Sequence, residues 1–588
     1  MRDTRCGRSW FVVLPDHESA SAVSLNACRR VAHPSGRPWL LGCWDDDFVL
    51  SVTGRRAVAV IGTSSVTPDE LARCDLDAVL TGSAHVVASI DGRVRVQGTV
   101  SGVRRVFHTR LNGMTVASDT AGVLASLTGA PLDDEWAATR LLYPALPHPV
   151  HRIAPWRGVE TVPEDCYLTL DDARVTRRWS PPAPELGLRE GAAGLRDALL
   201  AAVATRVRPG EPVAADLSGG MDSTSICFAA AQAGARLVTV TLDWGSGGTE
   251  DARHADLAAT AFGNVERIVR RTDDLPAFFD DVGSRSTLPD HTLPLVRERA
   301  QQRVIARELR ARGARVLLRG HGGDHVVMAP SSYVHTLLRR EPLTALRHIR
   351  AFRALERWPL LPTLKSLWDN SSYSSWLAGT AERLTTPFRT NALSMEDWGF
   401  PVLLPPWATP AAAELVRDVI RRAASVAEEL APGRGQHGAV FHARNAGQLA
   451  AQVEQGHGMA VAAPFCDDRV IEACLAVRLP DRSNPWQFKP LLAEAMRGLV
   501  PDAVLARRTK DNTNAQWHDG LRRNRAALAA LVDESPLAER GLVDRSVLRR
   551  AVLSPELARV PPPALENTIA CDVWLRDLEG SHVRSPAC

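Results

Sequence analysis

Lysine is almost missing from this chain. Among its 588 residues there are 70 lysines and arginines, and only Lys365, Lys489 and Lys510 are lysine. Such a bias suggests a GC-rich genome, so a remaining lysine is either a chance survivor or a residue whose chemistry needs a compact ammonium group. The net charge is only +3, which gives no case for general nucleic-acid binding.

Long hydrophobic runs and clustered cysteines are missing as well. No stretch of about 18 apolar residues is present, and residues 1–6 show no signal-peptide pattern, so we expect no membrane span and no secretory leader. The ten cysteines are scattered, without C-x-x-C pairs or zinc-type spacing. We therefore expect reduced thiols in a cytoplasmic protein, and about two to four domains from its length.

One stretch organises the rest of the chain. Residues 213–226 read V-A-A-D-L-S-G-G-M-D-S-T-S-I, which predicts a short strand, a small-residue turn and the start of a helix. Glycines let backbone N–H groups approach an anion, and the helix N-terminus adds positive potential. Because Asp222 would repel bare phosphate, we expect a divalent cation between them.

This turn is not one of the common nucleotide-binding fingerprints. It contains no lysine and matches neither G-x-x-x-x-G-K-[ST] nor G-x-G-x-x-G. S-G-G alone is equally compatible with a turn that binds nothing. The full S-G-G-M-D-S motif after an apolar strand is more specific, and it resembles the pyrophosphate loop of the ATP pyrophosphatases, which split ATP into AMP and pyrophosphate.

The pattern of elements divides the chain in two. Residues 1–180 read as mainly β, with a hairpin at Asp91-Gly92 and a helix near residues 134–142, which predicts a sandwich of sheets with flanking helices. A proline-rich linker, residues 181–189, follows. From residue 190 to 588 strands and helices alternate, which predicts an open parallel α/β sheet that binds ligands at the carboxyl ends of its strands.

A second glycine-rich loop lies at such a strand end. Arg319-Gly-His-Gly-Gly-Asp-His325 directly follows the predicted strand at residues 315–318. Two such loops on neighbouring strands would bring Asp222 and Asp324 to one magnesium ion on the pyrophosphate oxygens. The alternative is a flexible glycine turn.

These two loops and Ala463-Pro-Phe-Cys-Asp467 occur in the order found in asparagine-synthetase-like enzymes, which the chain resembles from about residue 190 to 517. In that family the second loop is typically S-G-E-G-S-D-E and the third segment V-P-F-L-D. Lys489 and Lys510 fall where the family has its C-terminal lysines, whereas Lys365 matches nothing there and is expected on the surface. The resemblance implies a Rossmann-like ATP-pyrophosphatase (PP-loop) domain with ATP and magnesium as cofactors.

The resemblance also implies a set of site residues. Pyrophosphate would bind at Ser218, Gly219, Gly220 and Ser223, and Leu217 belongs to the same ATP-binding set. Adenine and ribose would lie against Thr241 or Leu242 and against Gly320, and magnesium would bind at Asp222 and Asp324, while Lys510 would stabilise charge during catalysis. His321 replaces the family glutamate, and His325 the final acidic residue. Because histidine titrates near neutrality, His321 is either a base for an incoming amine or a residue that packs or binds phosphate.

The N-terminal half resembles, more loosely, the glutaminase domain of class II amidotransferases, an Ntn-type αββα sandwich, through residues 82–124. Those glutaminases use a cysteine that becomes the N-terminal residue, whereas here Arg2 follows Met1 and the first cysteine is Cys6. We therefore expect a degenerate domain without glutaminase activity that is structural or holds a substrate or partner.

The segment between Asp324 and Pro464 is longer than in asparagine or β-lactam synthetases, and we expect an enlarged helical insertion at residues 330–455. It carries five tryptophans, which either fill a helical core or line a groove for a large apolar substrate such as a peptide. They are Trp358, Trp368, Trp376, Trp398 and Trp407.

Together these departures resemble lasso-peptide cyclases. The resemblance implies that an Asp or Glu side chain of a precursor peptide is adenylated and then attacked by the peptide's N-terminal amine, which closes a macrolactam. It also implies a leader-binding protein and a leader peptidase as partners. Two alternatives stay open, a β-lactam-type or other small-molecule amide synthetase, and a non-catalytic scaffold that binds a peptide.

Overall fold

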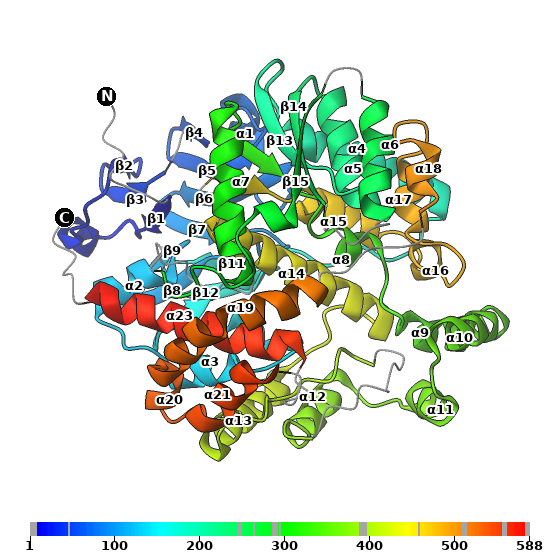
Figure 1. The fold of residues 1–588 in the computed structure, drawn as a ribbon. Coiled ribbons are helices and arrows are strands. Elements are labelled where there is room, and N and C mark those ends of the chain that lie inside the picture. Colours follow the sequence, from blue (N-terminus) through cyan, green and yellow to red (C-terminus); the bar gives the residue numbers. More distant parts are fainter. Residues whose placement is uncertain are drawn as a thin grey trace.

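The computed structural model describes residues 9–44, 47–243, 250–262, 265–284, 292, 296–386, 397–456, 459–507, 514–555 and 561–582. Two six-stranded antiparallel sheets form the N-terminal half, and a five-stranded parallel sheet follows. Figure 1 shows the parallel sheet and its helices beside the N-terminal sheets, with the C-terminal helices packed below both. The predicted order of a β-rich half and a parallel α/β half is therefore confirmed.

The first antiparallel sheet runs in the order β10-β8-β9-β1-β3-β2, and the second in the order β12-β11-β7-β6-β5-β4. The strands of the first are β1 (Trp10–Val13), β2 (Arg29–Ala32), β3 (Pro38–Cys43), β8 (Phe107–Leu111), β9 (Met114–Ser118) and β10 (Glu160–Thr161). Those of the second are β4 (Phe48–Thr53), β5 (Arg56–Ser64), β6 (Gly82–Ile90), β7 (Arg93–Gln97), β11 (Cys166–Thr169) and β12 (Arg174–Arg177).

Alternating side chains hold these sheets face to face. Phe11 and Val13 point into a buried core shared with Val87 and Val96 of the second sheet, whereas Val12 points to the opposite face. The outer faces are covered by helices α1 (Pro68–Arg73) on one side, and α2 (Ala121–Thr128) and α3 (Asp134–Thr139) on the other. The predicted hairpin joins β6 to β7 through Asp91 and Gly92, both at positive φ.

The prediction that all thiols are reduced is wrong for one pair. A disulfide joins Cys28 to Cys43, whose Cα atoms lie 4.9 Å apart. The antiparallel pairing of β2 with β3 sets Arg29 opposite Gly42 and so leaves the two cysteines side by side. Two cysteines 15 residues apart match no recognised sequence motif, so the disulfide can be inferred only from the register of the two strands.

The parallel sheet has the strand order β15-β14-β13-β16-β17. From β13 the chain first adds β14 and β15 on one side, and then adds β16 and β17 on the other side. Its strands are β13 (Pro212–Asp216), β14 (Arg236–Asp243), β15 (Glu266–Arg271), β16 (Val316–Leu318) and β17 (Ala460–Ala462). Helices α4 (Leu188–Ala204) and α5 (Met221–Gln232) share a core with one face, and α7 (Arg299–Ala311) with the other, while α6 (Glu250–Thr260) contacts β14.

Helices make up most of the rest. They are α8 (Gly323–Val327), α9 (Tyr333–Arg340), α10 (Pro342–Glu356), α11 (Leu360–Trp368), α12 (Tyr373–Ala381), α13 (Pro410–Val426), α14 (Arg434–Gly456), α15 (Asp468–Leu475), α16 (Leu479–Arg482), α17 (Pro490–Ala495), α18 (Asp502–Leu505), α19 (Asn514–Asp533), α20 (Pro536–Glu539), α21 (Arg545–Leu553) and α23 (Pro562–His582). None of the described helices is both long and apolar enough to cross a membrane.

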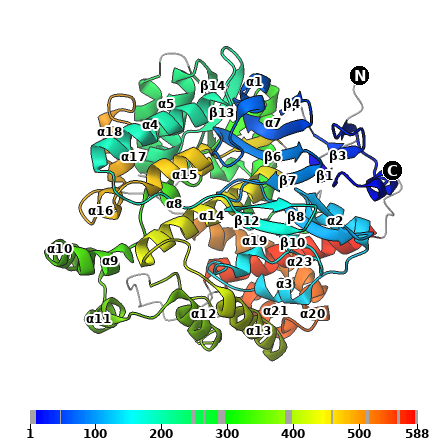
Figure 2. The ribbon, with the colours of Figure 1, turned by 180° about the vertical axis from the view of Figure 1, so that it is seen from behind.

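Four of the five tryptophans of the insertion fill cores, and the fifth is exposed. Trp358, Trp376, Trp398 and Trp407 are buried in cores, as expected of side chains that fill a helical layer. Trp368 is 74% exposed at the end of α11. Figures 1 and 2 both show α9, α10 and α11 projecting from the body of the protein.

The two halves are joined by buried polar contacts as well as by apolar packing. The backbone N–H groups of Val100 and Ser101 donate to the Asp468 carboxylate at 2.8 and 3.0 Å, and burial raises the pKa of Asp468 to about 6. Trp136 of α3 packs against Trp574 of α23 with ring centroids 4.8 Å apart. The C-terminal helices thus pack on the N-terminal half rather than on the parallel sheet alone.

We expect Asp468→Ala to lower the free energy of unfolding by about 2–4 kcal/mol, because two buried N–H groups would lose charge-assisted acceptors. The shift in urea midpoint measures this loss. Asp519→Ala is the matched control, since its ion pairs with Arg522 and Arg523 are exposed and should contribute less than about 1 kcal/mol. Equal shifts for the two variants would contradict the role given to Asp468.

Candidate active site

The candidate site lies beyond the carboxyl ends of β13 and β16, which are neighbours in the parallel sheet. The first loop, Ser218 to Gly220, leads directly into α5. Gly219 has a φ of +76°, and a Cβ there would lie 2.7 Å from the Ala255 nitrogen of α6, so the loop requires glycine. The Ser218 and Ser223 hydroxyl oxygens are 2.9 Å apart, and this contact spans the loop.

The second loop lies directly on the first. A Cβ on Gly320 would lie 2.6 Å from the Ser223 nitrogen, and one on Gly323 would lie 2.6 Å from Asp222 Oδ1. Only residues without side chains allow the backbone to approach this closely. The expectation that neighbouring strand ends bring the two loops together is therefore met in the structure.

Asp222 and Asp324 converge on a single cation, the ammonium group of Lys489. The Lys489 Nζ lies 2.5 Å from Asp222 Oδ2 and 2.6 Å from Asp324 Oδ1. The Lys489 side chain is almost fully buried, whereas that of Asp324 is 40% exposed. Lys489 falls at a family position in the sequence, but no role follows from that position alone. Its retention in a chain almost without lysine is the available signal.

The two carboxylates fit a magnesium ion that is shared with a substrate. No group of three or more His, Cys, Asp or Glu side chains gathers at a metal-binding distance within the described part of the chain. Magnesium is usually held by one or two carboxylates and completes its shell with water and phosphate oxygens. Asp222 and Asp324, whose oxygens already converge on one cation, would hold it, and it would neutralise charge on the phosphates.

The residues predicted to line adenine and ribose lie at the same edge of the sheet. The Thr241 hydroxyl donates to the Leu217 carbonyl oxygen at 2.8 Å, and both residues are buried. Leu242 packs partly buried against the core on the face that α7 covers. These side chains fix the ends of β13 and β14, and their contact with a nucleotide stays a prediction.

Lys510 lies outside the described residues, as do Arg2 and Cys6, but the residue that leads into its segment is well placed. Arg507 donates to the Gly219 carbonyl oxygen at 2.9 Å and forms an ion pair with Asp251 of α6. Sequence reasoning missed Arg507 because nothing local distinguishes it among so many arginines.

His321 is partly buried between the second loop and α14. Its Nε2 lies 3.2 Å from the Ala446 carbonyl oxygen. Because a carbonyl only accepts, Nε2 carries the proton and Nδ1 of the neutral ring keeps the lone pair. Burial lowers the pKa of His321 to about 4, which corrects the expectation that this residue titrates near neutrality, and the ring is neutral at pH 7.

The third predicted segment supports the structure around the loops. Asp467 forms a buried ion pair with Arg206, with a shortest N–O distance of 2.6 Å. This pair joins the end of α4 to the start of α15.

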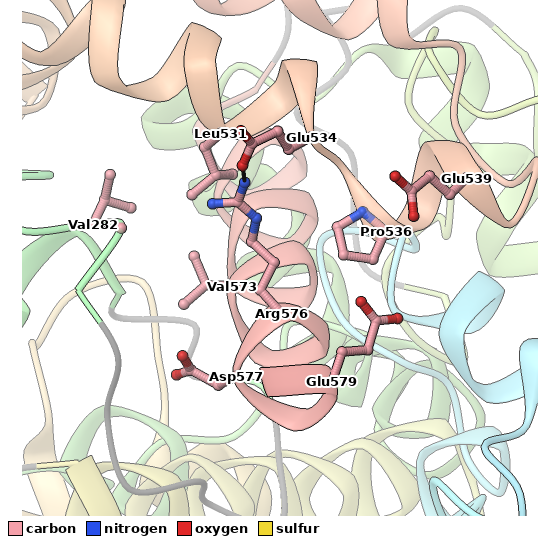
Figure 3. A pocket seen from close by; sticks show the side chains of 10 residues that line it. Val282, Leu531, Glu534, Pro536, Glu539, Val573, Arg576, Asp577 and Glu579 are labelled. Carbon is pink, nitrogen blue, oxygen red and sulfur yellow. Dashed lines mark hydrogen bonds and ion pairs between the residues drawn. The ribbon is translucent and has the colours of Figure 1, made fainter. Parts of the chain in front are cut away.

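A pocket elsewhere shares no residue with this site. It has a volume of about 310 Å³ and lies between α19, α20 and α23 (Figure 3). Four acidic side chains line it, and its one arginine, Arg576, is paired with Glu534. The residues that line this pocket include neither a glycine-rich loop nor a cation between two carboxylates, and the candidate site has both.

Residues 194–576 match the asparagine synthase family, which is more than half of the chain. The chain belongs to the asparagine synthase family. It is also similar to carboxyethyl-arginine beta-lactam-synthase from Streptomyces clavuligerus, with 32% identity over 237 residues. That similarity covers 38% of this chain and 44% of the relative, so the chain spans less than half of that protein's length.

Asparagine synthases and β-lactam synthases are amide-forming synthetases, so this is a family of ATP-dependent amide-bond ligases. Both loops and Lys489 lie inside the matched segment. The N-terminal sandwich lies outside it.

We expect Gly323→Ala to weaken binding of magnesium–ATP by about tenfold or more, because the new methyl group would displace the Asp222 carboxylate. Titration calorimetry measures the affinity. Gly194→Ala in α4 is the control, since an added Cβ there meets nothing within 4 Å. Unchanged affinity in Gly323→Ala would contradict the placement of the nucleotide over Asp222.

Proposed function

We propose that this asparagine synthase family member uses ATP to adenylate a carboxylate, releases pyrophosphate, and then joins the activated acyl group to an amine. The observation that carries the proposal is the convergence of Asp222, Asp324 and Lys489 above the loop formed by Ser218 to Gly220. A glycine-rich turn at a helix N-terminus binds phosphate oxygens, and the two carboxylates suit a cation that phosphates share.

The chain's own groups divide the work of the first step. The loop from Ser218 to Gly220, with the Ser223 hydroxyl, would donate hydrogen bonds to the departing pyrophosphate. Lys489 would hold the two carboxylates together and offset their charge, and Lys510 would stabilise negative charge as the substrate carboxylate attacks the α-phosphorus. The products are an acyl-adenylate and pyrophosphate.

His321 would serve the second step. Its ring is neutral, and its Nδ1 holds the lone pair that would take a proton from the attacking amine. The amine nitrogen then forms the new bond to the acyl carbon, and AMP leaves.

The finer proposal is that both reacting groups belong to one peptide. An Asp or Glu side chain of a precursor peptide would be adenylated, and the peptide's N-terminal amine would close a macrolactam. One observation supports a tethered amine over ammonia: His321 replaces a family glutamate. A leader-binding protein and a leader peptidase would prepare this substrate, and the N-terminal sandwich would act as a structural partner of the synthetase half.

A small-molecule substrate is the second candidate. The similarity to carboxyethyl-arginine beta-lactam-synthase supports an internal amide closure within a small amino acid derivative. The helical insertion at residues 330–455 favours the larger substrate, because it adds α9 to α14, of which α14 contacts α8 at the second loop.

Incubation of the protein with ATP, magnesium and a processed precursor peptide should yield a peptide lighter by one water, together with AMP. Mass spectrometry of the peptide detects the loss. Pyrophosphate release with small amino acid derivatives but not with peptides would favour the second candidate. Absence of pyrophosphate release with either substrate class would contradict the enzymatic proposal.

We expect His321→Ala to leave ATP–pyrophosphate exchange near the wild-type rate and to slow amide formation by about 100-fold or more. Because the pKa of His321 is about 4, this residue stays deprotonated above about pH 5. Its protonation should therefore not lower the rate of wild-type amide formation in that range. Exchange kinetics and product formation over a pH series separate the two steps. Equal loss of both steps in the variant would contradict the base assignment.

A further inference from the structure

The helices that project from the body carry an unusual share of the exposed apolar surface. We call residues 339–368, which include α10 and α11, the arm. Seven of the fourteen large hydrophobic side chains that are exposed in the described part of the chain lie on it. They are Leu343, Leu346, Leu355, Leu360, Leu361, Leu364 and Trp368. Leu343, Leu361 and Trp368 are each more than 70% exposed.

These side chains follow the helical repeat. On α11, Thr363 and Leu367 are buried, whereas Leu360, Leu361, Leu364 and Trp368 are exposed at the spacing of one helical stripe. The helix is therefore apolar on its inner and on its outer side. A solvent-facing helix side normally carries polar residues, so this outer stripe needs a partner of its own.

On α10 the same division holds. Ala345, Ile349 and Phe352 face the core, and Leu343 and Leu346 face outward.

Positive charge is concentrated on the same arm. Residues 339–368 contain seven arginines and lysines but only two glutamates, a net charge of +5 in a chain whose total is +3. Arg347 directly follows the exposed Leu346, and Lys365 directly follows the exposed Leu364. The cations are thus mixed with the exposed leucines rather than set apart from them.

We propose that the arm binds the surface of an anionic lipid bilayer, with the leucines and Trp368 in the headgroup and acyl boundary and the cations on lipid phosphates. The apolar core of a stable protein interface is depleted of charged residues, which disfavours a protein partner for a helix side on which the exposed Lys365 lies among the leucines. Interfacial helices combine leucine and tryptophan with arginine and lysine in this way, because headgroups are charged and the layer beneath is apolar. This surface is independent of the chemistry proposed at the two loops.

The full-length protein should float with vesicles of phosphatidylglycerol and phosphatidylcholine in equal parts, and should stay behind with vesicles of phosphatidylcholine alone. Raising the salt concentration should weaken the binding, since part of the attraction is electrostatic. Equal binding to both vesicle types, or no binding to the anionic ones, would overturn the proposal. Capture by poly-glutamate beads without vesicle binding would do so as well, in favour of an acidic protein.

Matched variants separate the arm from the rest of the surface. Leu361→Ser and Lys365→Glu should each weaken vesicle binding by about tenfold. Val426→Ser on α13, 75% exposed, and Arg522→Glu on α19 are the controls for lost apolar surface and reversed charge. All four positions are exposed, so thermal midpoints should stay at the wild-type value. A loss of binding as large in the controls as in the arm variants would overturn the proposal.

A second measurement tests the depth of contact. Brominated lipids quench tryptophan emission only at close range, so anionic vesicles that contain them should quench part of the protein's fluorescence. Trp368→Leu should bind with wild-type affinity but lose most of that quenching. Quenching that is absent in the wild type, or unchanged in Trp368→Leu, would overturn the insertion of this residue.

Discussion

The candidate site depends on one electrostatic arrangement, the placement of Lys489 between Asp222 and Asp324. Two carboxylates at the ends of neighbouring strands repel each other, and a buried ammonium group within 2.6 Å of both offsets that repulsion. The arrangement needs Gly320 and Gly323, because any side chain there would push the second loop away from the first. It also needs Lys489 itself, whose backbone φ of 48° directs the chain into α17.

Arginine side chains hold together the structure around this arrangement. Arg206 holds Asp467 below the loops, Arg507 joins the first loop to α6, and Arg319 bonds to Asp216 at the end of β13. A planar guanidinium with five donors suits such fixed positions, whereas the compact ammonium of lysine suits a cation between two carboxylates. Nearly all other basic residues of the chain are arginine, so arginine and lysine have different structural roles around the site.

Sequence reasoning succeeded where the signal is local. The strand, turn and helix around Ser218 to Gly220, the Asp91-Gly92 hairpin and most strands of the parallel sheet follow from apolar runs and glycine positions. It failed where structure depends on contacts distant in sequence. The three-residue strand β17 exists only because β16 pairs with it, and the Cys28–Cys43 disulfide exists only because of the strand register. Local patterns equally could not separate the exposed Trp368 from the four buried tryptophans, or Arg507 from other arginines.

If a carboxylate substrate attacks the α-phosphorus of ATP at this site, one carboxylate oxygen must end in AMP. Labelling the reacting carboxylate with heavy oxygen and analysing the nucleotide product by mass spectrometry tests this transfer. We expect AMP to carry one labelled oxygen, since the acyl-adenylate passes that atom to the phosphate when the amine displaces it. Label in inorganic phosphate with release of ADP, or AMP without label, would contradict it.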